Sequence, residues 1–232
     1  GSANMQSFWE QLYNAVIAKG RYLIYLEGLG NTITIALVAC AIGLAIGTLI
    51  AIVKYYAAIR HGIGWRIGAA ICDFYTTVIR GTPIILQLLI IYSITVWTKG
   101  TFACFVGFGI NSGAYVSEII RSGIKSVDIG QTEAGRSLGL SEGKTMRLIV
   151  LPQAIKNILP ALFNEFIALV KETSVAGYIA VRDMTMAANS IKTRVFNIVP
   201  LVVVAIVYLI IVIGLTQVQK SIERRLARSD RN

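Results

Sequence analysis

The chain has 232 residues, of which 55% are hydrophobic and 15% charged, and its formal net charge is +10. Soluble domains carry roughly 25% charged residues, so this composition indicates a protein that lies largely in a membrane. The basic residues gather at the ends of apolar runs, as the positive-inside rule requires, and this placement argues against nucleic-acid binding.

The N-terminal segment, residues 5–27, is predicted to form a helix on the membrane surface. Its apolar and aromatic residues, among them Trp9 and Tyr13, recur at helical spacing with polar residues between them. Residues 1–4 are interpreted as a cloning remnant before Met5. The glycines at 28 and 30 are expected to end the helix.

The first membrane span is predicted over Thr32–Val53, which contains no charge. At 1.5 Å per residue it is about 33 Å long, enough to cross the hydrocarbon core. Gly43 and Gly47 are spaced four residues apart and permit a close helix neighbour.

The second span is predicted to be a broken helix. Residues 67–79 and 84–97 are apolar, and Arg80-Gly81-Thr82-Pro83 interrupts them. A glycine and a proline in a span free backbone groups that can line a cavity. The third span, residues 101–117, becomes polar at Glu118.

The longest polar interlude runs from Asp128 to Pro152, and residues 126–147 are called the elbow below. Asp128 is predicted to cap a short helix, with Gln131 reaching back to it in a capping box. Gly139 is predicted to stop this helix in the left-handed conformation, and Ser141 to cap the next one.

Two further spans are predicted, over residues 148–170 and 198–218, separated by a polar segment on the outside or re-entrant. Basic residues follow the last span and border the elbow, so the elbow and the C-terminus are expected in the cytoplasm and the N-terminus outside. The chain is therefore expected to be an all-α, multi-pass protein with five transmembrane helices and an interfacial helix.

Several motifs resemble those of one transporter family. Gly130-Gln131-Thr132-Glu133-Ala134-Gly135, then Leu138-Gly139 and Val150-Leu151-Pro152-Gln153-Ala154, resemble the EAA loop of ABC importer permeases. Blocks elsewhere narrow the resemblance to permeases for polar amino acids: Arg80-Gly81-Thr82-Pro83 with Gln87, Ala114-Tyr115 with Glu118 and Arg121, Leu159-Pro160, and Lys171-Glu172-Thr173-Ser174. One departure is Gly135, where the family usually has alanine.

The resemblance implies a type I ABC importer permease fold over residues 28–232, with the elbow as coupling loop. It implies a prokaryotic inner-membrane subunit that imports polar, possibly basic, amino acids and catalyses no reaction. The partners would be two ATPase subunits, a second permease chain (identical or similar) and an external solute-binding protein. ATP and magnesium would bind the ATPase, and this chain would hold no cofactor.

In the elbow, the resemblance implies that a coupling helix enters a groove of the ATPase. Glu133 would contact the partner, Ala134 and Gly135 would allow its close approach, and Gly139 would set the angle. The residues expected to take part are Gln131, Glu133, Ala134, Gly135, Leu138 and Gly139.

Polar residues in the interrupted spans are the candidates for substrate contact, because such residues are costly in lipid and usually face a cavity. An amino-acid zwitterion needs a cation for its carboxylate, such as Arg80, and an anion for its ammonium group. The candidates are Arg80, Thr82, Gln87, Glu118, Asn164 and Glu165. The alternative is that they pair with one another, Arg80 with a glutamate and Lys171 with Glu172 or Glu165.

Other functional classes fit less well. An ion-driven secondary transporter is the alternative, but no internal repeat is visible and the elbow would have no purpose. An enzyme would need a nucleophile and base or a metal site, and the one histidine, His61, lies alone in a basic loop. Residues 139–145 resemble a phosphate-binding loop but have three residues between the glycines, where four are required.

Overall fold

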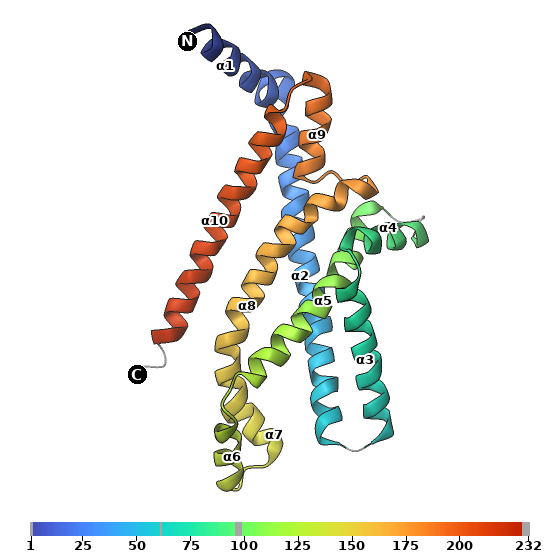
Figure 1. Ribbon diagram of the computed structural model, residues 1–232, viewed down its shortest axis with the longest axis vertical. Helices are drawn as coiled ribbons and strands as arrows, with labels where there is room; N and C mark the ends of the chain where they lie inside the picture. Colours follow the sequence, from blue (N-terminus) through green and yellow to red (C-terminus); the bar gives the residue numbers. More distant parts are fainter. Residues whose placement is uncertain (1, 61, 96–98, 229–232) are drawn as a thin grey trace.

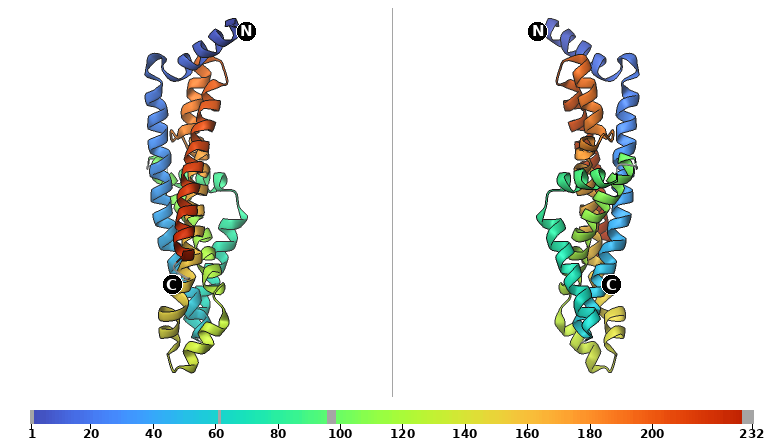
Figure 2. Two further views of the ribbon diagram at one scale, coloured as in Figure 1. Left: turned by 90° about the vertical axis from the view of Figure 1, so that its left-hand side faces the viewer. Right: turned by 90° about the vertical axis from the view of Figure 1, so that its right-hand side faces the viewer.

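The structure is a computed structural model that describes residues 2–60, 62–95 and 99–228. Every regular element in these ranges is helical, and together they form an elongated bundle (Figures 1 and 2). The α-helices are α1 (Ser2–Val16), α2 (Tyr22–Ile59), α3 (Ile63–Gly81), α4 (Ile84–Ile94), α5 (Gly100–Lys125), α6 (Ile129–Ser137), α7 (Glu142–Thr145), α8 (Leu151–Glu172), α9 (Met184–Val195) and α10 (Val199–Arg228). Short 3-10 or π-helical segments are η1 (Ala18–Gly20), η2 (Met146–Val150) and η3 (Thr173–Ile179).

Four helices in the described ranges are long and apolar enough to cross a membrane, and the bent pair α3–α4 makes up to five. Figure 1 shows α1 and α9 at one end of the bundle and α6 and α7 at the other. The elbow and the polar segment between the last two spans therefore lie at opposite ends of the bundle. This is expected when successive spans cross the membrane in alternating directions.

The helix break near the N-terminus lies earlier than predicted. Lys19 and Gly20 have positive φ angles, and the chain turns there into α2. The expected break at the glycines of positions 28 and 30 is wrong, because α2 runs through both without interruption. Gly28 instead serves packing, since a Cβ atom there would lie 2.8 Å from the carbonyl oxygen of Asp183.

The contact between α2 and α5 is the core of the bundle. Gly43 and Gly47 of α2 receive Ser112 and Val116 of α5: a Cβ atom on Gly47 would lie 2.5 Å from Val116 Cγ1. The contact is reciprocal, because two glycines of α5, at positions 109 and 113, receive two isoleucines of α2, at positions 42 and 46. The predicted close approach at Gly43 and Gly47 is confirmed.

The predicted break in the second span is also confirmed. α3 and α4 meet at an angle of 109°, so α4 turns aside rather than continuing the span. Gln87 stabilises the break: its amide nitrogen donates to the carbonyl oxygens of Ile79 and Thr82 and to Thr82 Oγ1, at 2.9, 3.1 and 2.8 Å. The backbone groups freed at the break are thus partly satisfied by a side chain. The predicted end of this segment, residues 96–98, lies outside the described residues.

The helices on either side of the elbow extend through the charged and proline residues of their spans. α5 continues past the predicted span end at residue 117 to Lys125, and Glu118 and Arg121 pair on its surface, three residues apart. α8 continues through Pro160 to Glu172. Charged or proline residues in these spans therefore did not mark helix ends.

Candidate functional site

An open cavity of ≈ 400 Å³ lies between the end of α3 and the facing sides of α5 and α8. Three of the six predicted substrate-contact residues, Arg80, Glu118 and Glu165, line it. The other lining residues are Tyr115, Ile119, Ser122, Gly123, Ser126, Asn157 and Ala161. Because it is the candidate for the predicted substrate site, we call it the substrate cavity.

Arg80 supplies the positive charge of the substrate cavity. Its guanidinium carbon lies 5.5 Å from the centre of the Tyr115 ring, in cation–π geometry. In the part of the chain that the structure describes, no ion pair joins Arg80 to a carboxylate. The planar donor group is therefore held over a ring and is not neutralised by an acid.

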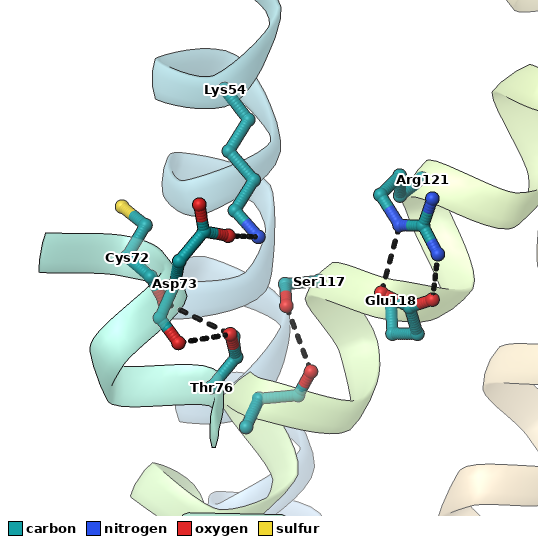
Figure 3. Close-up of polar contacts among 8 residues, drawn as sticks. Lys54, Cys72, Asp73, Thr76, Ser117, Glu118 and Arg121 are labelled. Atoms are coloured by element: carbon teal, nitrogen blue, oxygen red, sulfur yellow. Dashed lines mark hydrogen bonds and ion pairs between the residues drawn. The ribbon is translucent and has the colours of Figure 1, made fainter. Parts of the chain in front are cut away.

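The two glutamates of the substrate cavity differ in their partners. Glu165 is half-buried and accepts one hydrogen bond from Ser112 Oγ at 2.9 Å. Glu118 accepts two hydrogen bonds from Arg121, one of them from Nε at 2.9 Å (Figure 3). Among the described ion pairs, none joins either glutamate to Arg80, nor Lys171 to Glu165 or Glu172. Glu165 is thus the carboxylate that faces the cavity without a cationic partner.

The remaining predicted contacts lie elsewhere. Thr82 and Gln87 bond within the α3–α4 break, and Gln87 also accepts a hydrogen bond from Asn111 at 3.0 Å. Asn164 is exposed on α8 and does not line the substrate cavity. Sequence reasoning did not select Tyr115 or Asn157, although Tyr115 lies inside one of the motifs that carry the resemblance.

The elbow has the predicted helix ends, but two of the predicted side-chain caps are not made. Asp128 caps α6 by accepting a hydrogen bond from the backbone nitrogen of Gly130, and Gly139 has the left-handed φ of 82°. The predicted capping box is wrong, because the Gln131 side chain accepts from Gln153 Nε2 of α8, at 3.4 Å, and does not reach back. Ser141 stands at the start of α7 but makes no capping hydrogen bond with its side chain.

The two faces of α6 have different neighbours. Ile129 is 71% exposed, Glu133 lies one turn further along the same face, and Leu138 just beyond the helix is 81% exposed. Ala134 is also exposed, whereas Gly135 is buried. The exposed face of α6 therefore carries a carboxylate beside an exposed isoleucine, and an exposed leucine follows the helix.

The elbow is fastened to the first turns of α8 at two points. Asn157 donates from Nδ2 to Ser126 Oγ at 2.7 Å, next to the end of α5. Gln153 provides the second contact, to Gln131 of α6. These contacts connect the elbow to α8, which carries Glu165 further along.

Gly135 packs inside the elbow, and this gives a prediction. A Cβ atom there would lie 2.7 Å from Ile149 Cδ1 and 2.8 Å from Thr145 Cγ2, so the Gly135→Ala variant must displace these side chains or shift α6. We expect it to lower the thermal unfolding midpoint, because overpacking costs about 1–3 kcal/mol and helix propensity returns only about 1 kcal/mol.

The matched control is Gly143→Ala, in α7, where a Cβ atom would meet no atom within 4 Å. This variant should keep or raise the midpoint. Equal midpoints for the two alanine variants would contradict the packing that we assign to Gly135.

Comparisons with known proteins agree with this architecture. Residues 55–228 match the family model described as "Binding-protein-dependent transport system inner membrane component". The chain is 40% identical to the arginine transport system permease protein ArtQ of Bacillus subtilis (strain 168), over 88% of this chain and 93% of that one. It is 38% identical to a putative glutamine transport system permease protein, GlnP, of Rickettsia bellii (strain RML369-C), over 89% and 94%.

Solved structures show the same fold. A chain of a crystal structure described as "an amino acid ABC transporter with histidines" superposes with a TM-score of 0.81 at 36% identity, over 88% of this chain and 94% of that one. A chain of the inward-facing MetNI methionine ABC transporter gives 0.77 at 18% identity, over 90% and 99%, and shows the fold alone. The chain belongs to the family of binding-protein-dependent transport system inner membrane components and is an ABC importer permease of the type I fold, a multi-pass inner-membrane protein.

Proposed function

We propose that this permease forms the pathway for a basic amino acid, with arginine as the first candidate, in an importer powered by a separate ATPase. The observation that carries the proposal is the substrate cavity, where Arg80 and Glu165 both lack an oppositely charged partner among the described residues. One relative is named an arginine permease and another a putative glutamine permease, which supports an amino-acid substrate.

The charges of the cavity suit an amino acid, which carries a carboxylate and at least one cationic group. Arg80 can hold an α-carboxylate in two parallel hydrogen bonds, and Glu165 can hold an ammonium or guanidinium group. Glu118 is neutralised by Arg121, so the unpaired charges that line the cavity are +1 from Arg80 and −1 from Glu165. With its carboxylate at Arg80, a basic amino acid could place its side-chain cation at Glu165.

The elbow would be the contact with the ATPase. Glu133, Ala134 and the exposed side chains of Ile129 and Leu138 are proposed to enter a groove of that subunit, which binds ATP and magnesium. The hydrogen bonds from α8 to the elbow would then turn ATP-driven movement of α6 into tilting of α8.

The remaining partners and the orientation follow the family. We propose a second permease chain, identical or similar, that closes the open side of the substrate cavity, and an external binding protein that delivers the substrate. The elbow and the C-terminus would face the cytoplasm, because basic residues flank the spans at that end.

The test is ATPase activity of the reconstituted complex with its ATPase and binding protein, titrated with arginine, histidine, glutamine and glutamate. We expect arginine to stimulate, and Glu165→Gln to raise its half-saturating concentration about tenfold or more, because a hydrogen bond to a charged group contributes about 1.5–3 kcal/mol. Uptake by this chain alone, driven by an ion gradient, would contradict the proposal.

The control variant is Glu172→Gln, the same change on the same helix but outside the substrate cavity. It should leave the half-saturating concentration unchanged. An equal response of the two variants would remove Glu165 from the substrate site.

A further inference from the structure

A second cavity, of ≈ 210 Å³, lies between α2 and α5 at the elbow end of the bundle. We call it the α2–α5 cavity. Three of its lining side chains are cations, Lys54, Arg121 and Lys125, and no acid lines it. Its remaining walls are formed by Ala51, Tyr55, Ser117 and Ile124.

The neighbouring acids neutralise only part of this positive charge. Lys54 Nζ lies 2.6 Å from Asp73 Oδ1, and Arg121 pairs with Glu118, as Figure 3 shows. Lys125 is exposed and has no ion-pair partner in the described ranges. These two ion pairs leave Lys125 as the lining cation that is free to hold a negative charge, and the carboxylate of Glu142 also lies within electrostatic range of Tyr55.

A hydroxyl group in the same cavity also lacks a partner. The oxygen of Tyr55 is buried and has no hydrogen-bond partner among the described residues, whereas Ser117 Oγ donates to the carbonyl oxygen of Ala114 at 2.8 Å. A buried hydroxyl that lacks a hydrogen bond costs free energy, so an acceptor oxygen in the cavity would relieve this cost.

The cavity lies near a helix end where basic and aromatic side chains gather, as they do in the headgroup layer of a membrane. Lys54 lies five residues before the end of α2 at Ile59, roughly 8 Å along the helix axis. Beyond it, the Tyr56 and Trp65 rings lie 5.2 Å apart and Arg60 lies over Tyr56, as in an interfacial aromatic belt. Ile52, next to Ala51, is 47% exposed and offers an apolar surface beside the cavity.

We propose that the α2–α5 cavity binds the phosphate headgroup of an anionic phospholipid. Lys54, Arg121 and Lys125 surround the phosphate oxygens, Tyr55 donates its free hydroxyl to one of them, and an acyl chain lies along α2 past Ile52. Basic pockets between transmembrane helices bind anionic headgroups in this way, and the apolar walls favour a lipid over a soluble anion.

Arg121 links this site to the substrate cavity, because the carboxylate that it holds, Glu118, lines that cavity. A headgroup that draws Arg121 away leaves Glu118 free for a cationic substrate. This consequence rests on the proposed function, whereas lipid binding itself does not.

The test is native mass spectrometry of the full chain in detergent, titrated with dioleoylphosphatidylglycerol or dioleoylphosphatidylcholine. We expect the anionic lipid to bind at least tenfold more tightly, and Lys125→Gln to weaken it about fivefold, the typical share of one basic residue at a membrane surface. Tyr55→Phe should weaken it further while keeping the ring. Lys220→Gln, an exposed cation at the end of α10, is the matched control and should change nothing.

Three outcomes would overturn the lipid site. The first is equal binding of the two lipids, and the second is an equal effect of Lys125→Gln and Lys220→Gln. The third is displacement of the anionic lipid by millimolar inorganic phosphate, because this result would assign the cavity to a soluble anion. Unchanged thermal unfolding of each variant excludes misfolding as the cause. None of these measurements involves substrate, so they stand apart from the test of the transported amino acid.

Discussion

The Glu133→Arg variant is expected to lose its ATPase subunit during purification while its membrane helices stay folded. Glu133 is exposed on the outer face of α6, one turn from Ile129, which is 71% exposed. In the proposed complex its carboxylate is buried against the partner, where losing one member of a charge pair costs about 2 kcal/mol or more, equal to about 30-fold in affinity. Reversal of the charge adds repulsion to this loss.

The measurement is co-purification of the ATPase with a tagged permease, followed by thermal unfolding of the permease alone. The control is Glu10→Arg on α1, at the opposite end of the bundle, which changes the net charge equally. Loss of the ATPase in both variants would mean a general effect of charge. Retention of the ATPase by the Glu133 variant would contradict the docking face that we assign to α6.

Local signals in the sequence predicted the elbow well. Asp128 and Gly139 act where they were expected, because helix caps and left-handed glycines depend on a few neighbouring residues. The capping box failed because Gln131 has a competing partner, Gln153, which lies 22 residues away in the sequence. Helix caps depend on neighbouring residues in the sequence, whereas a competing hydrogen-bond partner for a capping side chain can come from a distant part of the fold.

The glycines show the limit of local reasoning in the spans. Gly28 and Gly139 look alike as residues, yet one packs α2 against the backbone of Asp183 and the other ends α6. The apolar pattern around Gly28 does not reveal a neighbour that is about 150 residues distant. In lipid, where small residues mark contacts between helices, a glycine is as often a packing site as a break.

The substrate cavity could be predicted in part. Charged residues in spans drew attention to Arg80, Glu118 and Glu165, and the three line one cavity. The same rule also selected Gln87, whose side chain instead donates hydrogen bonds to backbone carbonyl oxygens at the α3–α4 break. The rule predicts that a polar side chain in a span has a partner, but it does not predict whether that partner is substrate or backbone. The sequence did not show which of the two glutamates has a cationic partner. In the structure, Arg121 pairs with Glu118 within α5.

The second large effect is expected at Gly47, in the contact between α2 and α5. The Gly47→Ala variant would place a Cβ atom 2.5 Å from Val116 Cγ1 and 2.8 Å from the backbone nitrogen of Ser117. The backbone cannot move aside as a flexible side chain can, so the two helices must separate along the core of the bundle. Overpacking of this kind costs about 1–3 kcal/mol and occasionally more, and the loss is greatest where the neighbour is backbone.

The matched control is Gly30→Ala, the same substitution on the same helix, where a Cβ atom would meet nothing within 4 Å. Alanine is favoured over glycine in a helix by about 1 kcal/mol, so this variant should unfold at the same temperature or higher. We expect the Gly47 variant to unfold at a clearly lower temperature in the same detergent and to lose yield. Because both variants gain the same helix propensity, the difference between their midpoints measures the α2–α5 contact, and a difference of zero would mean that α2 and α5 do not pack through Gly47.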